Sequence, residues 1–180
     1  MRLHSLRRSR GFNLIEAMVA LVVISVGLLG IAKMQALAMS STGTAKMRSI
    51  AALESASLAS ALRADRAYWS GLTTATSVTF KNGAVTASTD SALQTNPTCE
   101  SAGACSTITD MVAYNLKNWS LELAAQMPKH DATLACSAGT VTVPVTCTIV
   151  LSWAENRVAV NAQADTGTVL LNNYTLYVEP

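Results

Sequence analysis

One acidic residue lies in a part of the sequence where a charge is costly. Residues 12–32 are predominantly apolar, and Glu16 is the single charged residue among them. A charged side chain inside a membrane-spanning helix costs about 2.5 kcal/mol or more, so it is expected to have a functional partner. The alternative is that Glu16 lies near the membrane edge, where its carboxylate reaches water.

The segment around Glu16 has the length and the flanks of a membrane helix. At about 1.5 Å per residue, a run from residue 12 to residue 32 spans the roughly 30 Å hydrocarbon core of a bilayer. Four arginines and no acidic residue precede it, namely Arg2, Arg7, Arg8 and Arg10. The positive-inside rule therefore predicts a cytoplasmic N-terminus and a single crossing, with the rest of the chain on the outer side.

The composition argues against several classes of function. Only 13% of the 180 residues are charged, about half the usual share in globular proteins, and the mean hydropathy is +0.30. A formal net charge of +2 is far from the basic excess of a nucleic-acid binder. With two histidines, His4 and His130, there is little room for a histidine metal site. We therefore expect no metal, no cofactor and no nucleic-acid partner.

All the cysteines follow the apolar segment: Cys99, Cys105, Cys136 and Cys147. An even number in a segment expected outside the cytoplasm favours two disulfides. The sequence contains no CxxC pattern that would indicate a redox or zinc site. Of the three possible pairings we expect the two between near neighbours, Cys99–Cys105 and Cys136–Cys147. Free buried thiols are the alternative.

The residues at the start of the apolar segment form a recognisable pattern. Residues 11–16 are GFNLIE, and they stand between a basic leader and about twenty apolar residues. This pattern resembles the processing signal of type IV prepilins and pseudopilins, with Asn13 where threonine or serine is commoner. The resemblance implies that a prepilin peptidase cuts after Gly11 and that Phe12 becomes the methylated N-terminal residue. It also implies that Glu16 pairs with the Phe12 amine of a neighbouring subunit.

Two glycines, Gly27 and Gly30, lie inside the apolar segment. Each weakens a helix by about 1 kcal/mol relative to alanine. Either they are simply tolerated, because membrane helices accept glycine, or they allow close helix packing or local melting during assembly. Both interpretations stay open at this stage.

We expect the chain to divide into three parts. Residues 1–11 form a leader, and residues 12–66 form a long helix of which residues 12–32 span the membrane. Residues 67–180 form an outer α+β head. Between residues 33 and 66 there is no proline, and apolar residues recur at near-helical spacing, which predicts that the membrane helix continues outward.

The head is expected to contain a hairpin, a helix and several strands. Asn82-Gly83 between two β-favouring runs predicts a hairpin over residues 77–86. An apolar residue at every third or fourth position predicts a helix that begins after an N-cap at Thr107 and ends at Pro128. His130 is expected in a solvated turn. Strands are expected at residues 133–136, 140–143, 147–153, 157–164 and 174–178.

Three segments of the head are similar to PilV-type minor pilins. They are residues 114–128, with an aromatic–Leu–Trp pattern ending in Met-Pro, residues 147–157, and the C-terminal run YTLYVEP. The resemblance implies the type IV pilin fold. In this α+β architecture, a long N-terminal helix packs on a C-terminal antiparallel sheet with one further helix. The resemblance is weakest over residues 70–105.

These resemblances imply a minor pilin that primes or promotes assembly of a type IV pilus, near its tip, and so supports twitching motility and adhesion. The implied partners are other minor and major pilins, the prepilin peptidase, the inner-membrane assembly machinery, a tip adhesin, and inner-membrane lipid before assembly. The implied location is the inner membrane, with the leader in the cytoplasm and the head in the periplasm, and then the pilus on the cell surface.

Two other functions compete with this one. A pseudopilin of a type II secretion system would share the N-terminal signal, and a membrane-tethered adhesin or binding module would share the anchor. An enzyme is not expected, because the sequence contains no phosphate-binding glycine loop. His130 is also the one histidine beyond the leader that could serve a catalytic triad.

Overall fold

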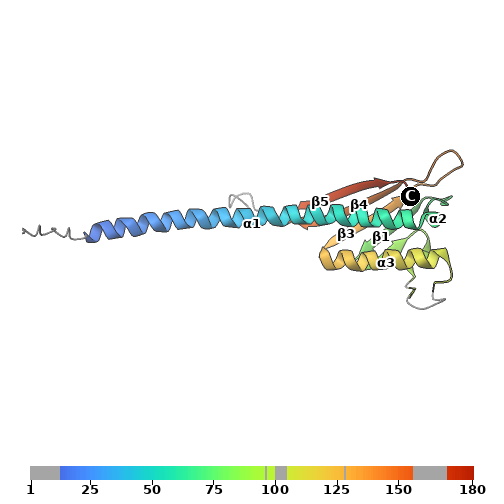
Figure 1. Cartoon of the computed structure of the whole chain (residues 1–180), viewed down its shortest axis with the longest axis horizontal. Helices are drawn as coiled ribbons and strands as arrows, with labels where there is room; N and C mark the ends of the chain where they lie inside the picture. Colours follow the sequence, from blue (N-terminus) through green and yellow to red (C-terminus); the bar gives the residue numbers. More distant parts are fainter. Residues whose placement is uncertain (1–12, 96, 100–104, 128, 156–169) are drawn as a thin grey trace, which may run out of the picture. The chain divides into compact units, whose positions relative to one another are not determined.

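The computed structural model describes residues 13–95, 97–99, 105–127, 129–155 and 170–180. The chain forms two compact units, Met1–Thr42 and Gly43–Pro180, and we call the second unit the head. Helix α1 (Leu14–Ala64) begins in the first unit and ends in the head (Figure 1). The prediction of one long helix that continues beyond the apolar segment is therefore confirmed.

In its described residues, the head adds two helices, one 3-10 turn and five strands to the end of α1. The strands form one sheet in the order β2-β1-β3-β4-β5, and every neighbouring pair is antiparallel. A long apolar helix, an antiparallel sheet and a further helix make an α+β architecture of the type IV pilin kind, as predicted. In chain order the elements are α2 (Arg66–Trp69), β1 (Thr76–Lys81), β2 (Ala84–Ser88), η1 (Ser91–Gln94), α3 (Ile108–Gln126), β3 (His130–Cys136), β4 (Cys147–Glu155) and β5 (Leu170–Val178).

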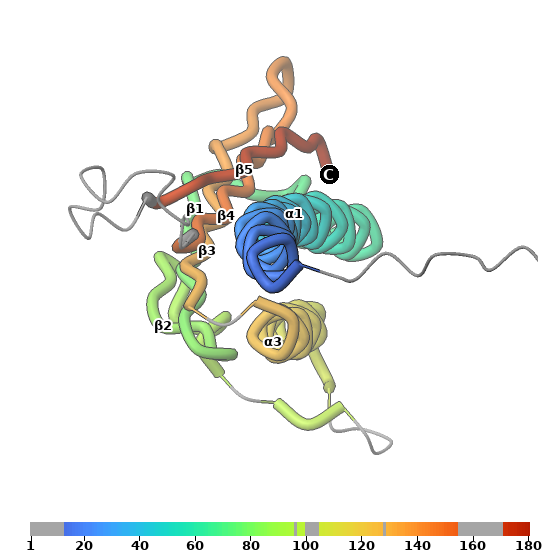
Figure 2. Tube along the Cα trace, turned by 90° about the vertical axis from the view of Figure 1, so that its left-hand side faces the viewer, coloured from blue at the N-terminus to red at the C-terminus, as the bar shows by residue number. Residues whose placement is uncertain are grey.

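The head is built in two layers. Figure 2 shows the head part of α1 and the whole of α3 on the same face of the sheet. Side chains alternate between buried and exposed along β3, because successive residues of a strand point to opposite faces. The core lies between the layers. It includes Val78, Phe80, Leu134, Ile149 and Leu151 from the sheet, and Ala51, Leu58, Leu62, Leu116 and Leu123 from the two helices.

The hairpin between β1 and β2 turns at the predicted dipeptide. Asn82 and Gly83 have φ values of 51° and 77°, which is the left-handed conformation that a tight two-residue turn requires. Gly83 is also close to α3, because a Cβ atom built on it would lie 3.2 Å from Leu121 Cδ2. A side chain at this position would therefore disturb both the turn and its packing against α3.

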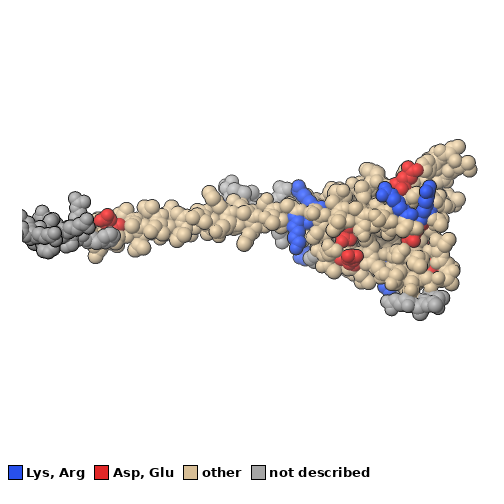
Figure 3. Space-filling view, in the orientation of Figure 1, with Lys and Arg blue, Asp and Glu red and all other residues tan. Residues whose placement is uncertain are grey.

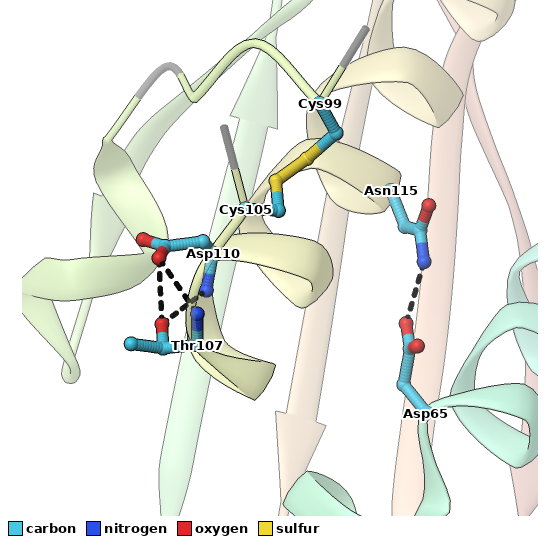
Figure 4. The surroundings of a disulfide bond; sticks show 6 residues. All are labelled: Asp65, Cys99, Cys105, Thr107, Asp110 and Asn115. Atoms are coloured by element: carbon cyan, nitrogen blue, oxygen red, sulfur yellow. Dashed lines mark hydrogen bonds between the residues drawn. A yellow bond between two sulfur atoms is a disulfide. The ribbon is translucent and has the colours of Figure 1, made fainter. Parts of the chain in front are cut away.

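Helix α3 begins with a reciprocal pair of hydrogen bonds, shown in Figure 4. The Thr107 hydroxyl oxygen accepts from the Asp110 backbone N–H at 3.1 Å, and the Asp110 carboxylate accepts from the Thr107 backbone N–H at 3.1 Å. This capping box satisfies two of the backbone donors that a helix start leaves unpaired. The prediction of Thr107 as the N-cap is confirmed.

Two local predictions for the head were wrong. Residues 140–143 form a turn instead of a strand, closed by a 2.9 Å hydrogen bond from Thr140 N to Val143 O. His130 is not in a solvated turn but is the first residue of β3 and is buried, with Nδ1 against the Met127 carbonyl. The strand expected at residues 157–164 lies outside the described residues.

Both disulfides in the structure join the expected near neighbours. Cys136 and Cys147 face each other at the ends of β3 and β4, and both are buried. Cys99 and Cys105 are joined ahead of α3 and are partly exposed (Figure 4). The first bridge closes the hairpin of the inner strands β3 and β4, whereas the second joins two partly exposed cysteines ahead of α3.

We expect the two bridges to contribute unequally to stability. Replacing both Cys136 and Cys147 with alanine should lower the free energy of unfolding of the full chain by about 2–4 kcal/mol, because a loop constraint and buried sulfur packing are lost together. The matched control, alanine at Cys99 and Cys105, removes a bridge outside the core and should cost less. Urea unfolding of the full chain in detergent micelles measures both free energies. A larger loss of stability in the control would contradict the larger contribution of the Cys136–Cys147 bridge.

A buried carboxylate joins α1 to α3. Glu54 is 3% exposed, and its Oε1 accepts a hydrogen bond from Gln126 Nε2 at 2.7 Å. Its backbone carbonyl accepts from Trp119 Nε1 at 3.0 Å, whereas its Oε2 has no hydrogen-bond partner within the described part of the chain. Burial raises the pKa of Glu54 above the ordinary value of 4.5, and the charge of Glu122 raises it further, while the Gln126 hydrogen bond lowers it.

The raised pKa predicts how the stability of the head depends on pH. Between 4.5 and the raised pKa, the folded state holds a proton on Glu54 that the unfolded chain has released, so stability is lost as pH rises through this window. Glu54→Gln removes the charge and keeps an oxygen that can accept from Gln126. We expect the variant to melt at a higher temperature than the wild type at neutral pH, with the difference vanishing near about pH 4.

Thermal melting of the full chain in detergent micelles, followed by circular dichroism over a pH series, measures this difference. Glu122→Gln is the matched control, because Glu122 is exposed and contributes only part of the shift. It should reduce the pH dependence to a smaller extent than Glu54→Gln. A difference between wild type and Glu54→Gln that is constant over the series would show that Glu54 does not titrate as described.

Candidate functional site

The candidate site is the N-terminal segment of α1, and Asn13 forms its start. The Asn13 backbone carbonyl accepts from the backbone N–H of Glu16 at 3.0 Å and of Ala17 at 3.3 Å. Its side-chain oxygen also accepts from Ile15 N at 3.4 Å. Asn13 therefore occupies the N-cap position, for which asparagine, serine and threonine are all well suited. This explains physically why asparagine can stand where serine or threonine is commoner in the motif.

Glu16 lies in the first turn of α1, three residues after the cap. A carboxylate at this position is stabilised by the unpaired N–H groups and the positive end of the helix dipole. The side chain is exposed, and among the described residues it makes no ion pair or side-chain hydrogen bond. The structure of the single chain thus places an acidic group at the start of the helix with its polar atoms available to a partner.

The helix that follows Glu16 is apolar around its whole circumference. From Leu14 to Ile31 every leucine, isoleucine, valine and methionine is more than half exposed. In Figure 3 the visible face of this part of α1 carries acidic atoms only at its start. Within the described part of the chain, α1 is the one helix long and apolar enough to cross a membrane, with a mean hydropathy of 2.5 over its most apolar window.

The few polar and small residues of this segment are accommodated locally. The Ser25 hydroxyl donates to the Leu21 carbonyl at 2.6 Å, so its hydrogen bond is satisfied within the helix. A Cβ atom added at Gly27 or Gly30 would meet nothing within 4 Å. Neither glycine is therefore required by packing within the described part of the chain.

The other predicted site residues fall in different places. Gly11 and Phe12 lie outside the described residues, so their processing stays a prediction. The four cysteines lie in the head, where they form the two disulfides. Glu16 is thus the one predicted site residue that the structure describes in this segment.

Sequence comparison with family models finds a match that falls on this segment. Residues 6–32 match the family model of the prokaryotic N-terminal methylation motif. The N-terminus carries a prepilin-type methylation signal. The signal supports a type IV pilin-like or pseudopilin-like protein, membrane anchoring through the apolar helix, and interaction with pilus or secretion-system components in general. Neither the curated proteins nor the solved structures give a match to this chain.

Sequence reasoning did not find the polar contacts that hold the end of α1 to α3. Glu54 bonds to α3 as described above, and Asp65 accepts a hydrogen bond from Asn115 Nδ2 at 2.9 Å (Figure 4). The available signal was a carboxylate at the same helical phase as Ala51, Leu58 and Leu62, which are all buried. An acidic residue within an apolar helix stripe indicates a buried polar contact, although its partner cannot be named from periodicity.

The cap at Asn13 gives a testable prediction. Asn13→Ala removes the side-chain acceptor and should weaken the first turn by about 1 kcal/mol, so the Ile15 amide should exchange about fivefold faster. Asn13→Ser is the matched control and should restore the slower exchange, because serine is an equally good cap. Hydrogen exchange by NMR on the full chain in detergent micelles measures this. Equal exchange rates in all three proteins would show that the side chain does not cap the helix.

Proposed function

We propose that this chain is a minor pilin of the PilV type, which enters a type IV pilus and primes or promotes its assembly near the tip. In this proposal a prepilin peptidase cuts after Gly11, and Phe12 becomes the methylated N-terminus. The chain waits in the inner membrane with its head in the periplasm and then moves into the pilus, where it supports twitching motility and adhesion. Its partners are other minor and major pilins, a tip adhesin and the inner-membrane assembly machinery.

The observation that carries the proposal is the exposed carboxylate of Glu16 at the start of a helix that is otherwise apolar on all sides. Lipid can cover the apolar side chains but offers no stable partner for the charge. An ammonium group at the same depth does, and the Phe12 amine of an adjacent subunit would lie one helical turn from its own Glu16. Because an unpaired buried charge is costly, such a contact also fixes the axial step between subunits.

Two competing functions make different use of the same residues. A membrane-tethered binding module would need the apolar anchor but would have no use for a carboxylate five residues after a processing glycine. A pseudopilin of a type II secretion system would use both, and what favours a minor pilin is the similarity of the segments 114–128, 147–157 and 174–180. The location of the mature chain, in pili or in the membrane, distinguishes these functions.

The proposal is tested first by processing and location. N-terminal sequencing of the chain recovered from sheared pili should begin at methylated Phe12, and Gly11→Val should accumulate the uncut precursor in membranes. Recovery of an uncut chain would refute the prepilin assignment. A correctly processed chain that is absent from pili but required for secretion would favour the pseudopilin.

The Glu16 contact is tested by substitution. Glu16→Ala should give a processed, stable, membrane-bound protein that is strongly depleted from sheared pili, because the partner amine is left uncompensated at a cost of about 3–5 kcal/mol. Ser25→Ala is the matched control within the same segment and should enter pili normally, since the Ser25 hydroxyl bonds only within α1. Normal incorporation of Glu16→Ala would remove Glu16 from the assembly contact.

A further inference from the structure

The two edges of the sheet are protected very differently. Strand β2, at one edge, has five residues, and its register with β1 shifts between Thr79 and Phe80. The 3-10 helix η1 follows it closely, and Gln94 Nε2 donates to the Ser88 carbonyl at 3.3 Å. A short strand, a register irregularity and a covering segment are devices by which proteins prevent an edge from pairing with another chain.

Strand β5, at the other edge, shows none of these devices within the described part of the chain. Its nine residues pair with β4 one for one, from Leu170 opposite Glu155 to Val178 opposite Cys147, with no register shift. It contains no charged residue and no proline. Figure 2 places it at the end of the sheet, and no described strand pairs with its outer edge. A long, regular and uncharged edge is a template for a further strand.

Side chains along β5 also leave apolar surface uncovered. On the face away from the helices, Leu171 and Tyr177 are 75% and 76% exposed. On the opposite face, Tyr174 and Leu176 pack against the core but are only partly buried. A strand added to this edge would place its own side chains beside both pairs, because directly opposed residues of antiparallel strands lie about 4.5–5.5 Å apart.

We propose that the outer edge of β5 receives an extended segment of a different protein of the same assembly, which adds a sixth strand to the sheet. The proposal rests on the proposed function in that it places both proteins in one pilus complex. The backbone of the segment would supply the hydrogen bonds, and apolar side chains beside Leu171 and Tyr177 would supply the specificity. Because β5 carries no charge, the chemistry that fits is an uncharged strand with apolar residues at alternate positions.

A second copy of this chain fits the edge less well. Strand β2 is short and its register with β1 shifts, so pairing between two copies would favour β5. In Figure 1 β5 and the head part of α1 run in the same direction. Copies that stand side by side with these parts of α1 parallel would therefore present parallel β5 strands. Such an arrangement does not allow the antiparallel pairing that continues this sheet, whereas a segment of another protein can run in either direction.

Photocrosslinking tests the proposal on the full chain in cells that assemble pili. The photoreactive residue p-benzoylphenylalanine is placed at Asn173 or Tyr177, both exposed on β5, and at Ala87, exposed on β2, as the control. Mass spectrometry then identifies the crosslinked residues. Residues 173 and 177 should crosslink to one partner protein at sites about four residues apart in reversed order, because antiparallel strands advance one residue for one. Ala87 should give no such pair.

A second arm uses a charge to block the edge. Thr175→Lys lies between the two probe sites on the exposed face and should reduce the crosslink from Tyr177 at least tenfold, since a lysine on an edge strand opposes pairing. Ala87→Lys adds the same charge to the opposite edge and should leave the crosslink unchanged. Both variants should remain at wild-type level in membranes and keep the wild-type resistance of the head to added protease, which shows that the head is folded.

The outcomes separate this proposal from the proposed function. Three results would overturn the docking of a strand from another protein. They are crosslinks to another copy of this chain, crosslinks to partner residues that are not about four apart in reversed order, and crosslinks of the same yield from Ala87. Absence of any crosslink while the chain is present in sheared pili would overturn it as well and leave the minor pilin assignment standing. Crosslinks about four residues apart in reversed order, in a chain that never enters pili, would support strand addition at β5 and refute the pilus function.

Discussion

A helix that is apolar on every side is unstable in water, and the rest of the structure depends on this constraint. The first part of α1 buries none of its side chains within the described structure, so its stable environment must come from lipid or from other subunits. The one charge of the apolar segment lies at the beginning of the helix, where Asn13 caps the backbone and the Glu16 side chain is exposed. The segment thus exposes apolar side chains that need a cover from outside the chain, and it carries its one charge at its start.

In the head the same helix is amphipathic, because one side packs on the core and the other faces solvent. From Ala51 onward α1 buries one stripe against the sheet, and polar contacts tie it sideways to α3. Trp119 and Gln126 bond to Glu54 near one end of this seam, and Asn115 bonds to Asp65 near the other. The core of the head therefore needs α1 from Ala51 onward, and a cut within that part of the helix would expose the core.

Much of this architecture follows from local rules that act on a few residues. Asn82-Gly83 fixes a hairpin because both residues accept a left-handed backbone, and Thr107 with Asp110 fixes the start of α3 because the two side chains cap each other. The N-terminal segment was equally predictable, because one charge in an apolar run is a strong signal. The pairing of the cysteines matched the expectation from their short separations, although spacing alone leaves other pairings open.

One failure has a local cause, and the others arise because neighbours distant in sequence decide the outcome. Residues 140–143 alternate like a strand, but Thr140 and Val143 bond to each other and close a turn. His130 follows a polar stretch, yet its place opposite Trp153 in the ladder puts it in the core. Neither Gln126 nor Asn115 can be assigned to an acidic partner on α1 from periodicity, because helix phase gives the face of a residue and not the element that it meets.

The hairpin of β3 and β4 has a mechanical property that follows from its covalent closure. These are central strands of the sheet, and Cys136 and Cys147 join them where the loop of residues 137–146 leaves the sheet. A pull applied to that loop reaches both strands through a covalent bond and loads them together. The ladder between them cannot be unzipped pair by pair from this end, so a tensile force meets the combined shear resistance of their outer neighbours, β1 and β5.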